Sequence, residues 1–329
     1  DISMRFDLTV PLAKYVAKNY GNLSFPFRRY QIGKVYRGEK AQKGRYREFY
    51  QCDIDVIGDE SYNAEIELIT ATGRALLRLP IGDFFIRVNN RQVLKAVLLS
   101  FGFEEDSLDN ICIILDKLDK IGVDGVVNEL EEASYGHDAI LKLKDLISRP
   151  VTLDMIEKII PQNPNLEILN NVIDGANALS DSKYKVVYDF TLVRGQGYYT
   201  GCVFEIASSK FGGTIGGGGR YDNLIGKFTG EATPAVGFSI GFERIYAILH
   251  EIGFKVPGRK KLAIIYKNDY IGAFKLADTY RNTYEVSMYA FPKKVGKLLN
   301  RLELQGFNAY IIYDKDNDEN NLNTIDANN

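Results

Sequence analysis

The chain has 329 residues, of which 45% are hydrophobic and 26% charged, a composition typical of a globular protein with two or three domains. Its net charge of −2 carries no basic signature, so contact with nucleic acid would have to use local patches. Three cysteines without a CxxC pair and only two histidines argue against a disulfide framework, a cysteine zinc site and histidine-based catalysis. The sequence contains no apolar run of about 18 residues and opens with no signal peptide, which predicts a cytoplasmic protein without a membrane partner.

Alternating strand and helix patterns begin the chain, and Asp7 or Thr9 can cap the first helix, with Pro11 in its first turn. Residues 103–181 are helical and acidic and carry no catalytic signal, which predicts an insertion between two parts of one domain. Outside this insertion the expected helices cover residues 7–20, 62–79, 91–100 and 237–250, and the expected strands cover 27–36, 46–56, 84–88, 185–190, 200–206 and 213–217, with 224–230 ambiguous.

Residues 253–261, rich in Pro, Gly and charge, predict a linker, and strands then alternate with helices, which favours a small α/β domain over 262–329. The polar and acidic tail from residue 314 predicts disorder. The expected strands are 262–266, 286–290 and 309–313, and the expected helices are 270–280 and 294–305.

The most informative segment is YRGEKAQKGRYREFYQCDID, which begins at Tyr36. It predicts a strand, a basic loop and a return strand. Arg37 can bind phosphate because its planar guanidinium matches paired phosphate oxygens. On the return strand Gln51, Asp53 and Asp55 share one face by the two-residue period. A charged and solvated surface hairpin is the alternative.

This segment resembles motif 2 of a class II aminoacyl-tRNA synthetase, and specifically of a histidyl-tRNA synthetase. Three further segments support the resemblance in the same order: RFDLTVPLAKYVA, LVRGQGYYTGCVFE and GGGGRYDNLIGKFTGEATPAVGFSIGFERI. Together they span Arg5 to Ile245. The resemblance implies an α+β fold, with an antiparallel sheet flanked by helices, a catalytic domain in two parts (1–102 and 182–252), the helical insertion and a C-terminal anticodon-binding-type α/β domain that is incomplete. It also implies that a motif 1 segment, which builds the interface of a homodimer, precedes Asp1.

The resemblance implies a histidine–tRNA ligase, which joins histidine and ATP to histidyl-adenylate and then acylates tRNA-His. Adenylation is an in-line attack of a carboxylate on phosphorus, so it needs fixed substrates and cations around the phosphates, without a protein nucleophile. Arg37 and Arg194 are the implied catalytic residues at the α-phosphate, and Mg²⁺ would accompany ATP through ligands that cannot be assigned. The implied ATP-binding residues are Arg37, Glu39, Arg45, Phe49 (a face for the base) and Arg244 (the β- or γ-phosphate).

Histidine selection requires a polar pocket, because a site that hydrogen-bonds both ring nitrogens rejects apolar isosteres. The implied histidine-binding residues are Asp55 and Tyr199 for the imidazole, Asp7, Thr9 and Gln51 for the α-amino group, Tyr198 and Tyr221 along the pocket, and Arg194 at the carboxylate. Core packing is the alternative for the tyrosine pair. Lys40 and Lys43 of the basic loop are expected to meet the acceptor end of tRNA, and a merely solvated loop is the alternative.

Two features leave other functions open. Gln196-Gly197 stands where the family usually has Leu-Asp, so a carboxylate is lost beside Arg194. This loss and the shortened last domain allow a degenerate synthetase-like protein. A regulatory subunit of ATP phosphoribosyltransferase shares the catalytic fold, but the α/β region after Lys261 and the retained arginines argue against it. The glycines of residues 212–219 match neither a P-loop nor a Rossmann fingerprint, and predict close backbone packing beneath the substrate.

Overall fold

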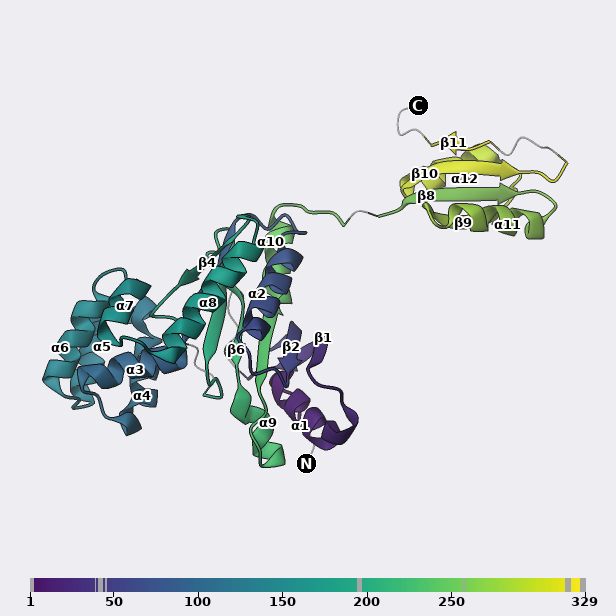
Figure 1. The fold of residues 1–329 in the computed structure, drawn as a ribbon. Coiled ribbons are helices and arrows are strands. Elements are labelled where there is room, and N and C mark those ends of the chain that lie inside the picture. The colour runs from purple at the N-terminus through teal and green to yellow at the C-terminus, as the bar shows by residue number, and fades with distance from the viewer. Residues whose placement is uncertain are drawn as a thin grey trace. The chain divides into compact units, whose positions relative to one another are not determined.

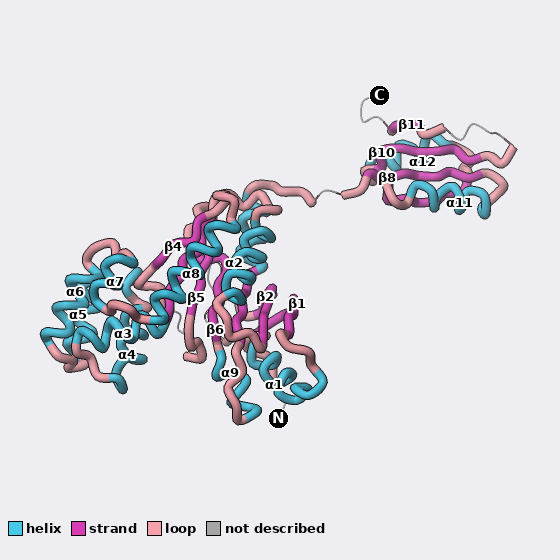
Figure 2. Tube along the Cα trace, viewed as in Figure 1, coloured by secondary structure: helices cyan, strands magenta, loops and turns pink. Residues whose placement is uncertain are grey.

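The computed structural model describes residues 3–38, 40, 44, 46–193, 197–256, 258–316 and 321–325. The chain divides into two compact units, Asp1–Phe254 and Lys255–Asn329 (Figure 1). Strands form a sheet in each unit, drawn in magenta in Figure 2.

The first unit is built on a seven-stranded sheet in the order β1-β2-β7-β6-β5-β3-β4. All neighbouring strands are antiparallel except β3 and β4, which are parallel. This arrangement confirms the expected antiparallel sheet flanked by helices. The strands are β1 (Phe27–Tyr36), β2 (Glu48–Ile57), β3 (Phe84–Asn90), β4 (Lys185–Tyr188), β5 (Cys202–Ser208), β6 (Gly213–Arg220) and β7 (Ala235–Gly241).

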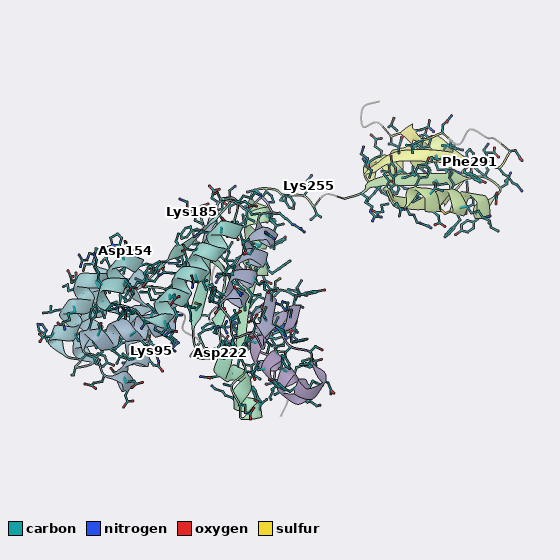
Figure 3. The ribbon with its side chains drawn as sticks, in the orientation of Figure 1. Lys95, Asp154, Lys185, Asp222, Lys255 and Phe291 are labelled. Atoms are coloured by element: carbon teal, nitrogen blue, oxygen red, sulfur yellow. The ribbon has the colours of Figure 1, made fainter. Side chains whose placement is uncertain are left out.

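Helices α2 and α8 lie beside each other along the sheet, whereas α3 to α7 gather in a separate helical cluster that includes Lys95 on α3 (Figures 1 and 3). The N-cap of α1 is Leu8 rather than the predicted Asp7 or Thr9, but Asp7 still accepts a hydrogen bond from the first turn, from the N–H of Val10 to Oδ1 at 3.0 Å. The helices of this unit are α1 (Thr9–Asn19), α2 (Asn63–Leu76), α3 (Arg91–Phe101), α4 (Leu108–Leu115), α5 (Leu118–Glu132), α6 (His137–Ile147), α7 (Leu153–Ile159), α8 (Pro164–Leu179), α9 (Asp222–Thr229) and α10 (Phe242–Glu251). Two 3₁₀ turns add Tyr20–Asn22 and Glu105–Ser107.

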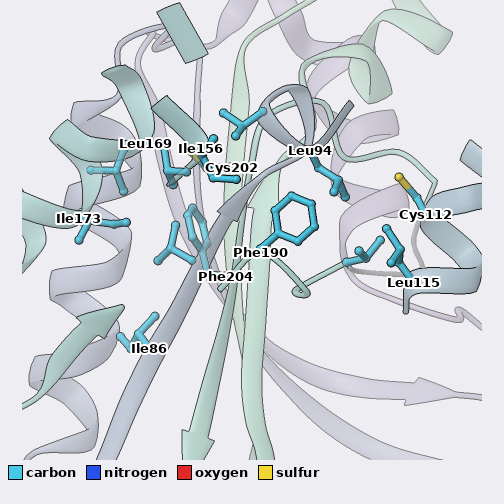
Figure 4. Packing of buried hydrophobic residues seen from close by; sticks show 14 of the residues in the cluster. Ile86, Leu94, Cys112, Leu115, Ile156, Leu169, Ile173, Phe190, Cys202 and Phe204 are labelled. Carbon is cyan, nitrogen blue, oxygen red and sulfur yellow. The ribbon is translucent and has the colours of Figure 1, made fainter. Parts of the chain in front are cut away.

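One hydrophobic core joins the sheet to the helical cluster. Phe204 and Ile86 from the sheet belong to the same buried cluster as Leu94 of α3 and Leu169 of α8 (Figure 4). Phe190, which follows β4, is also fully buried there. Because these side chains pack together, the sheet and the helices of residues 91–179 share apolar burial, the main favourable contribution to folding.

The second unit has a sheet in the order β11-β10-β8-β9, with one helix packed on each face. Leu262 and Ile264 pack with α11, and Ala263 and Ile265 pack with α12, because successive side chains of a strand point to opposite faces. Strands β8, β9 and β10 are parallel and β11 is antiparallel to β10. The elements are β8 (Lys260–Tyr266), α11 (Tyr270–Tyr280), β9 (Tyr284–Ala290), α12 (Val295–Leu304), β10 (Phe307–Tyr313) and β11 (Asn323–Thr324).

Three local predictions need correction. The helix expected at 237–250 is wrong over its first part, because residues up to Gly241 form β7 between β2 and β6, and sheet pairing overrides the local pattern. The strand expected from residue 200 begins at Cys202, and the ambiguous 224–230 segment lies mostly in α9, which starts at Asp222 (Figure 3). The tail expected to be disordered contributes β11, whose residues pair with Ala309 and Tyr310.

Candidate active site

A cavity of about 310 Å³ opens over the central strands of the first unit. Residues of β2, β6 and β7 form its floor, and the segment before α1, the 198–199 loop and the start of α10 complete its wall. Ten residues implied by the sequence line it: Asp7, Thr9, Arg37, Phe49, Gln51, Asp55, Tyr198, Tyr199, Tyr221 and Arg244.

The other implied site residues either do not line the cavity or lie outside the described residues. Lys40 is exposed and does not line the cavity. Glu39, Lys43, Arg45 and Arg194 lie outside the described residues, so their implied roles stay predictions.

Arg37 is held at the edge of the cavity by two aromatic rings. Its guanidinium lies 4.5 Å from the ring centre of Phe6 and 4.9 Å from that of Phe49. Its Nη2 donates to Gln51 Oε1 at 3.3 Å, and its Nε donates to the Phe6 carbonyl at 3.3 Å. The ring contacts and hydrogen bonds together restrict the Arg37 side chain. An anion that binds to its guanidinium would therefore cause little further loss of side-chain entropy.

Arg244, in the first turn of α10, supplies a second cation. Its Nε donates to the Gly44 carbonyl at 3.2 Å, its Nη1 donates to the Thr214 carbonyl, and its guanidinium lies 5.8 Å from the ring centre of Phe211. Glu243 next to it accepts the N–H of Tyr50 at 2.7 Å, which ties the start of α10 to β2. The arginine that the sequence placed in a helix therefore reaches the cavity through a contact between α10 and the sheet.

Asp55 is the most tightly held acid of the cavity. Tyr221 donates its hydroxyl to Asp55 Oδ1 at 2.5 Å, and Arg29 Nε lies 3.0 Å from Asp55 Oδ2. Burial raises the pKa of Asp55, and the charge of Arg29 and the Tyr221 hydrogen bond act in the opposite direction. The group can therefore accept a hydrogen bond from a polar ligand, while Arg29 compensates its charge.

Tyr198 and Tyr199 pack against hydrophobic core residues and also line the cavity. The rings of Tyr198 and Tyr199 lie 4.9 Å apart, and that of Tyr198 meets Tyr221 edge-on at 6.1 Å. Tyr199 and Tyr221 belong to the buried cluster of α1 and α9, and all three rings also line the cavity. The core interpretation and the site interpretation of these residues are therefore compatible.

The glycines of β6 bring the backbone to the cavity floor, and Gly216, Gly217 and Gly218 line it directly. A Cβ at Gly218 would collide with the carbonyl of Gly237 on β7. The close backbone packing predicted for this run is present, because only glycine leaves room for it.

Several residues near the cavity received no role from the sequence, and four of them bear on its charge and hydrogen bonds. Asp53 shares a cavity-facing strand face with Gln51, a face that the two-residue period identified. Ser239 and Glu243 lie in the segment read as one helix, so the strand that presents Ser239 was missed. Arg29 reaches Asp55 only through the register of β1 and β2, which pairs the two residues directly.

The family resemblance implies a histidine pocket around Asp55, and on that assignment replacing Gly237 with alanine is expected to weaken histidine binding without unfolding the protein. The added Cβ would collide with Asp55 Oδ1 and press on the Tyr221 ring, so the Asp55–Tyr221 hydrogen bond would be displaced. We expect a loss of about tenfold in affinity, the effect of one hydrogen bond to a charged group. Titration calorimetry measures it, and Gly241→Ala, where a Cβ meets only ordinary contacts, is the control. Equal affinities in the two variants would contradict this prediction.

Among the residues that the structure describes, no three metal-binding side chains of His, Cys, Asp or Glu gather as a potential metal site. No described helix combines the length and apolar character needed to span a bilayer. The charged side chains that line the cavity in the described part of the chain are those of Arg37, Arg244, Asp7, Asp53, Asp55 and Glu243.

A family model for histidyl-tRNA synthetase matches residues 1–245. The chain belongs to the histidyl-tRNA synthetase family. Among related sequences, the histidine–tRNA ligase of Leifsonia xyli is 44% identical over 261 residues, which cover 76% of this chain and 60% of the relative. The ligase of Rhodopirellula baltica is 37% identical over 331 residues, covering 94% of this chain and 74% of that protein.

Solved structures of the family agree with the fold. The histidyl-tRNA synthetase from Nostoc sp. PCC 7120 aligns with a TM-score of 0.79 and 31% identity, over 94% of this chain and 75% of that one. A protein from Bacillus halodurans, described as an ATP phosphoribosyltransferase regulatory subunit/histidyl-tRNA synthetase, aligns with a TM-score of 0.71 and 25% identity, over 90% and 77% of the two chains.

Proposed function

We propose that this protein is a histidine–tRNA ligase that activates histidine with ATP and transfers it to tRNA-His. The observation that carries the proposal is that arginines and buried acids line one cavity. Arg37 and Arg244 line it together with Asp7, Asp53, Asp55 and Glu243. Such a cavity suits a nucleotide triphosphate beside an amino acid that carries a cationic amino group and a polar ring.

The reaction needs positioning and charge stabilisation rather than a nucleophile from the protein. In our proposal Arg37 binds the α-phosphate and stabilises the charge that grows as the histidine carboxylate attacks phosphorus in line and pyrophosphate leaves. Arg244 binds the β- or γ-phosphate, and Arg194 takes the second position at the α-phosphate by resemblance to the family. Phe49 and the loop residues Glu39 and Arg45 complete the ATP-binding set.

The histidine substrate is proposed to lie beside the aspartates. Asp55 and Tyr199 would bind the imidazole, Tyr198 and Tyr221 would enclose it, and Asp7, Thr9 and Gln51 would bind the α-amino group. A ligand that cannot match these buried polar groups would leave them unpaired, which is the physical basis of selection.

Mg²⁺ fits this cavity without a dedicated metal cluster, because it is commonly held by one or two carboxylates together with phosphates and waters. Glu243, which lines the cavity beside Arg244, is the carboxylate suited to hold it. When bound, the ion would neutralise phosphate charge.

The partners of the protein are also proposals. We propose that tRNA-His meets the loop of Lys40 and Lys43 at its acceptor end and that the second unit serves as the anticodon-binding-type domain. A homodimer in the cytoplasm is the proposed working form. The family membership supports these assignments.

Histidine-dependent exchange between ATP and pyrophosphate tests the proposal, with alanine as the control amino acid. Exchange with histidine alone is expected, followed by charging of tRNA-His. A folded protein that binds histidine but catalyses no exchange would instead support a histidine-sensing regulatory paralogue or a degenerate synthetase.

A further inference from the structure

Asp53 is a buried acid of the cavity that the proposed reaction does not yet use. Its side chain is only 4% exposed and lines the cavity between those of Gln51 and Asp55 on β2. The described residues include no lysine or arginine within ion-pair distance of its carboxylate, whereas Asp55 has Arg29. A carboxylate buried in this way is costly unless it is protonated or meets a cation.

Gln51 contacts both Arg37 and Asp53 in the cavity. Its Oε1 accepts from Arg37 at 3.3 Å, while its Nε2 donates to Ser239 Oγ at 3.1 Å and approaches Asp53 Oδ1 at 3.5 Å. The amide thus faces the phosphate-binding cation in one direction and Asp53 in the other. An amino acid whose carboxylate points to Arg37 would carry its ammonium group, one carbon away, toward Asp53.

Two other acids border the same space but have partners of their own. Asp7 Oδ1 accepts the N–H of Val10, and Asp55 is bound by Tyr221 and Arg29. Among the described residues, three acids and one paired cation border this part of the cavity, so it carries an excess of negative charge when Asp53 is ionised. The excess favours a ligand with a fixed positive charge.

We propose that Asp53, together with Asp7, binds the α-ammonium group of the substrate and so selects an amino acid over its des-amino analogue. The proposal rests on the proposed function, because it assigns a role within the same amino-acid site. Asp55 keeps its proposed role at the imidazole. The two neighbouring carboxylates would therefore bind different parts of one ligand, Asp53 the ammonium group and Asp55 the ring.

The affinity for an ammonium-bearing ligand should depend on pH through the ionisation of Asp53. Burial raises its pKa to about 7; Asp55 and Asp7 raise it too, whereas the Ser239 hydrogen bond and Arg29 oppose the rise. A bound ammonium group favours the charged carboxylate, so its proton must leave on binding, and binding tightens as pH rises from 6 to 8. We expect the affinity ratio of wild type to Asp53→Asn to grow about tenfold over this interval, and comparison with the variant removes the titration of the ligand itself.

The decisive experiment measures the binding of three ligands to the full chain by titration calorimetry, with inhibition of exchange as the second readout. Histidine and histamine carry the ammonium group, and 3-(imidazol-4-yl)propionate lacks it. Asp53→Asn is expected to weaken histidine and histamine by at least about tenfold and the propionate by less than about twofold. The control Asp55→Asn should weaken all three ligands alike, because each contains imidazole.

The outcomes separate this inference from the proposed function. Equal losses for all three ligands in Asp53→Asn would assign it to the imidazole or to the structure alone and overturn the inference, while the proposed function would stand. If wild-type protein bound none of the ligands and catalysed no exchange, the proposed function and the inference would both fail.

Discussion

Arg37→Ala is expected to lower histidine-dependent ATP–pyrophosphate exchange by about 10²–10³-fold, the usual effect of removing one preorganised group that stabilises transition-state charge. The guanidinium contacts the rings of both Phe6 and Phe49, so it is positioned before any substrate arrives. Its loss should reduce kcat more than it raises KM for histidine, because the charge on phosphorus grows only during the reaction.

The matched control for this prediction is Arg28→Ala. Arg28 lies at the start of β1, whereas Arg37 follows its last residue. Arg28 is half exposed and pairs with Glu67 at the surface. Arg28→Ala should leave the rate of ATP–pyrophosphate exchange unchanged, and both variants should retain the circular dichroism spectrum of the wild type. Arg37→Lys is expected to recover only part of the activity, since an ammonium group lacks the planar fork. If folded Arg37→Ala kept full exchange activity, the proposed role of Arg37 at the phosphate would be wrong.

Glu65→Ala is expected to destabilise the first unit by about 3 kcal/mol, the lower end of the cost of breaking a buried ion pair, because Arg220 keeps its contact with Asp222. Glu65 on α2 is 1% exposed and accepts two hydrogen bonds from Arg220, at 2.6 Å from Nε and 2.5 Å from Nη2. Arg220 ends β6 and also donates to the carbonyls of Asp59 and Ser61. The pair therefore ties α2 to the strand that leads into Tyr221.

Glu67→Ala, two residues along the same helix, is the control for this prediction. Its pair with Arg28 has side chains 43% and 50% exposed, so its loss should cost at most about 1 kcal/mol. Urea unfolding followed by circular dichroism compares the two variants. Similar midpoints for both would mean that the buried pair contributes little more than the surface pair.

The sequence was most informative where a pattern repeats over many residues. The bounds of β1 and α11 agree with the predicted strand at 27–36 and helix at 270–280. The prediction of a helix around Ser239 was wrong because this segment has no such long pattern. It is short, rich in glycine and apolar on both faces, and sheet pairing with β2 and β6 decides its conformation.

The candidate site shows the same division. The sequence alone determined the family, the fold class and most of the side chains that line the cavity, because motif residues and the two-residue period of β2 are properties of the chain itself. Only the tertiary structure decided that Arg29 compensates Asp55, that Glu65 compensates Arg220 and that Asp53 has no such cation among the described residues. These pairings depend on strand register and on burial, and both arise when segments distant in sequence pack together.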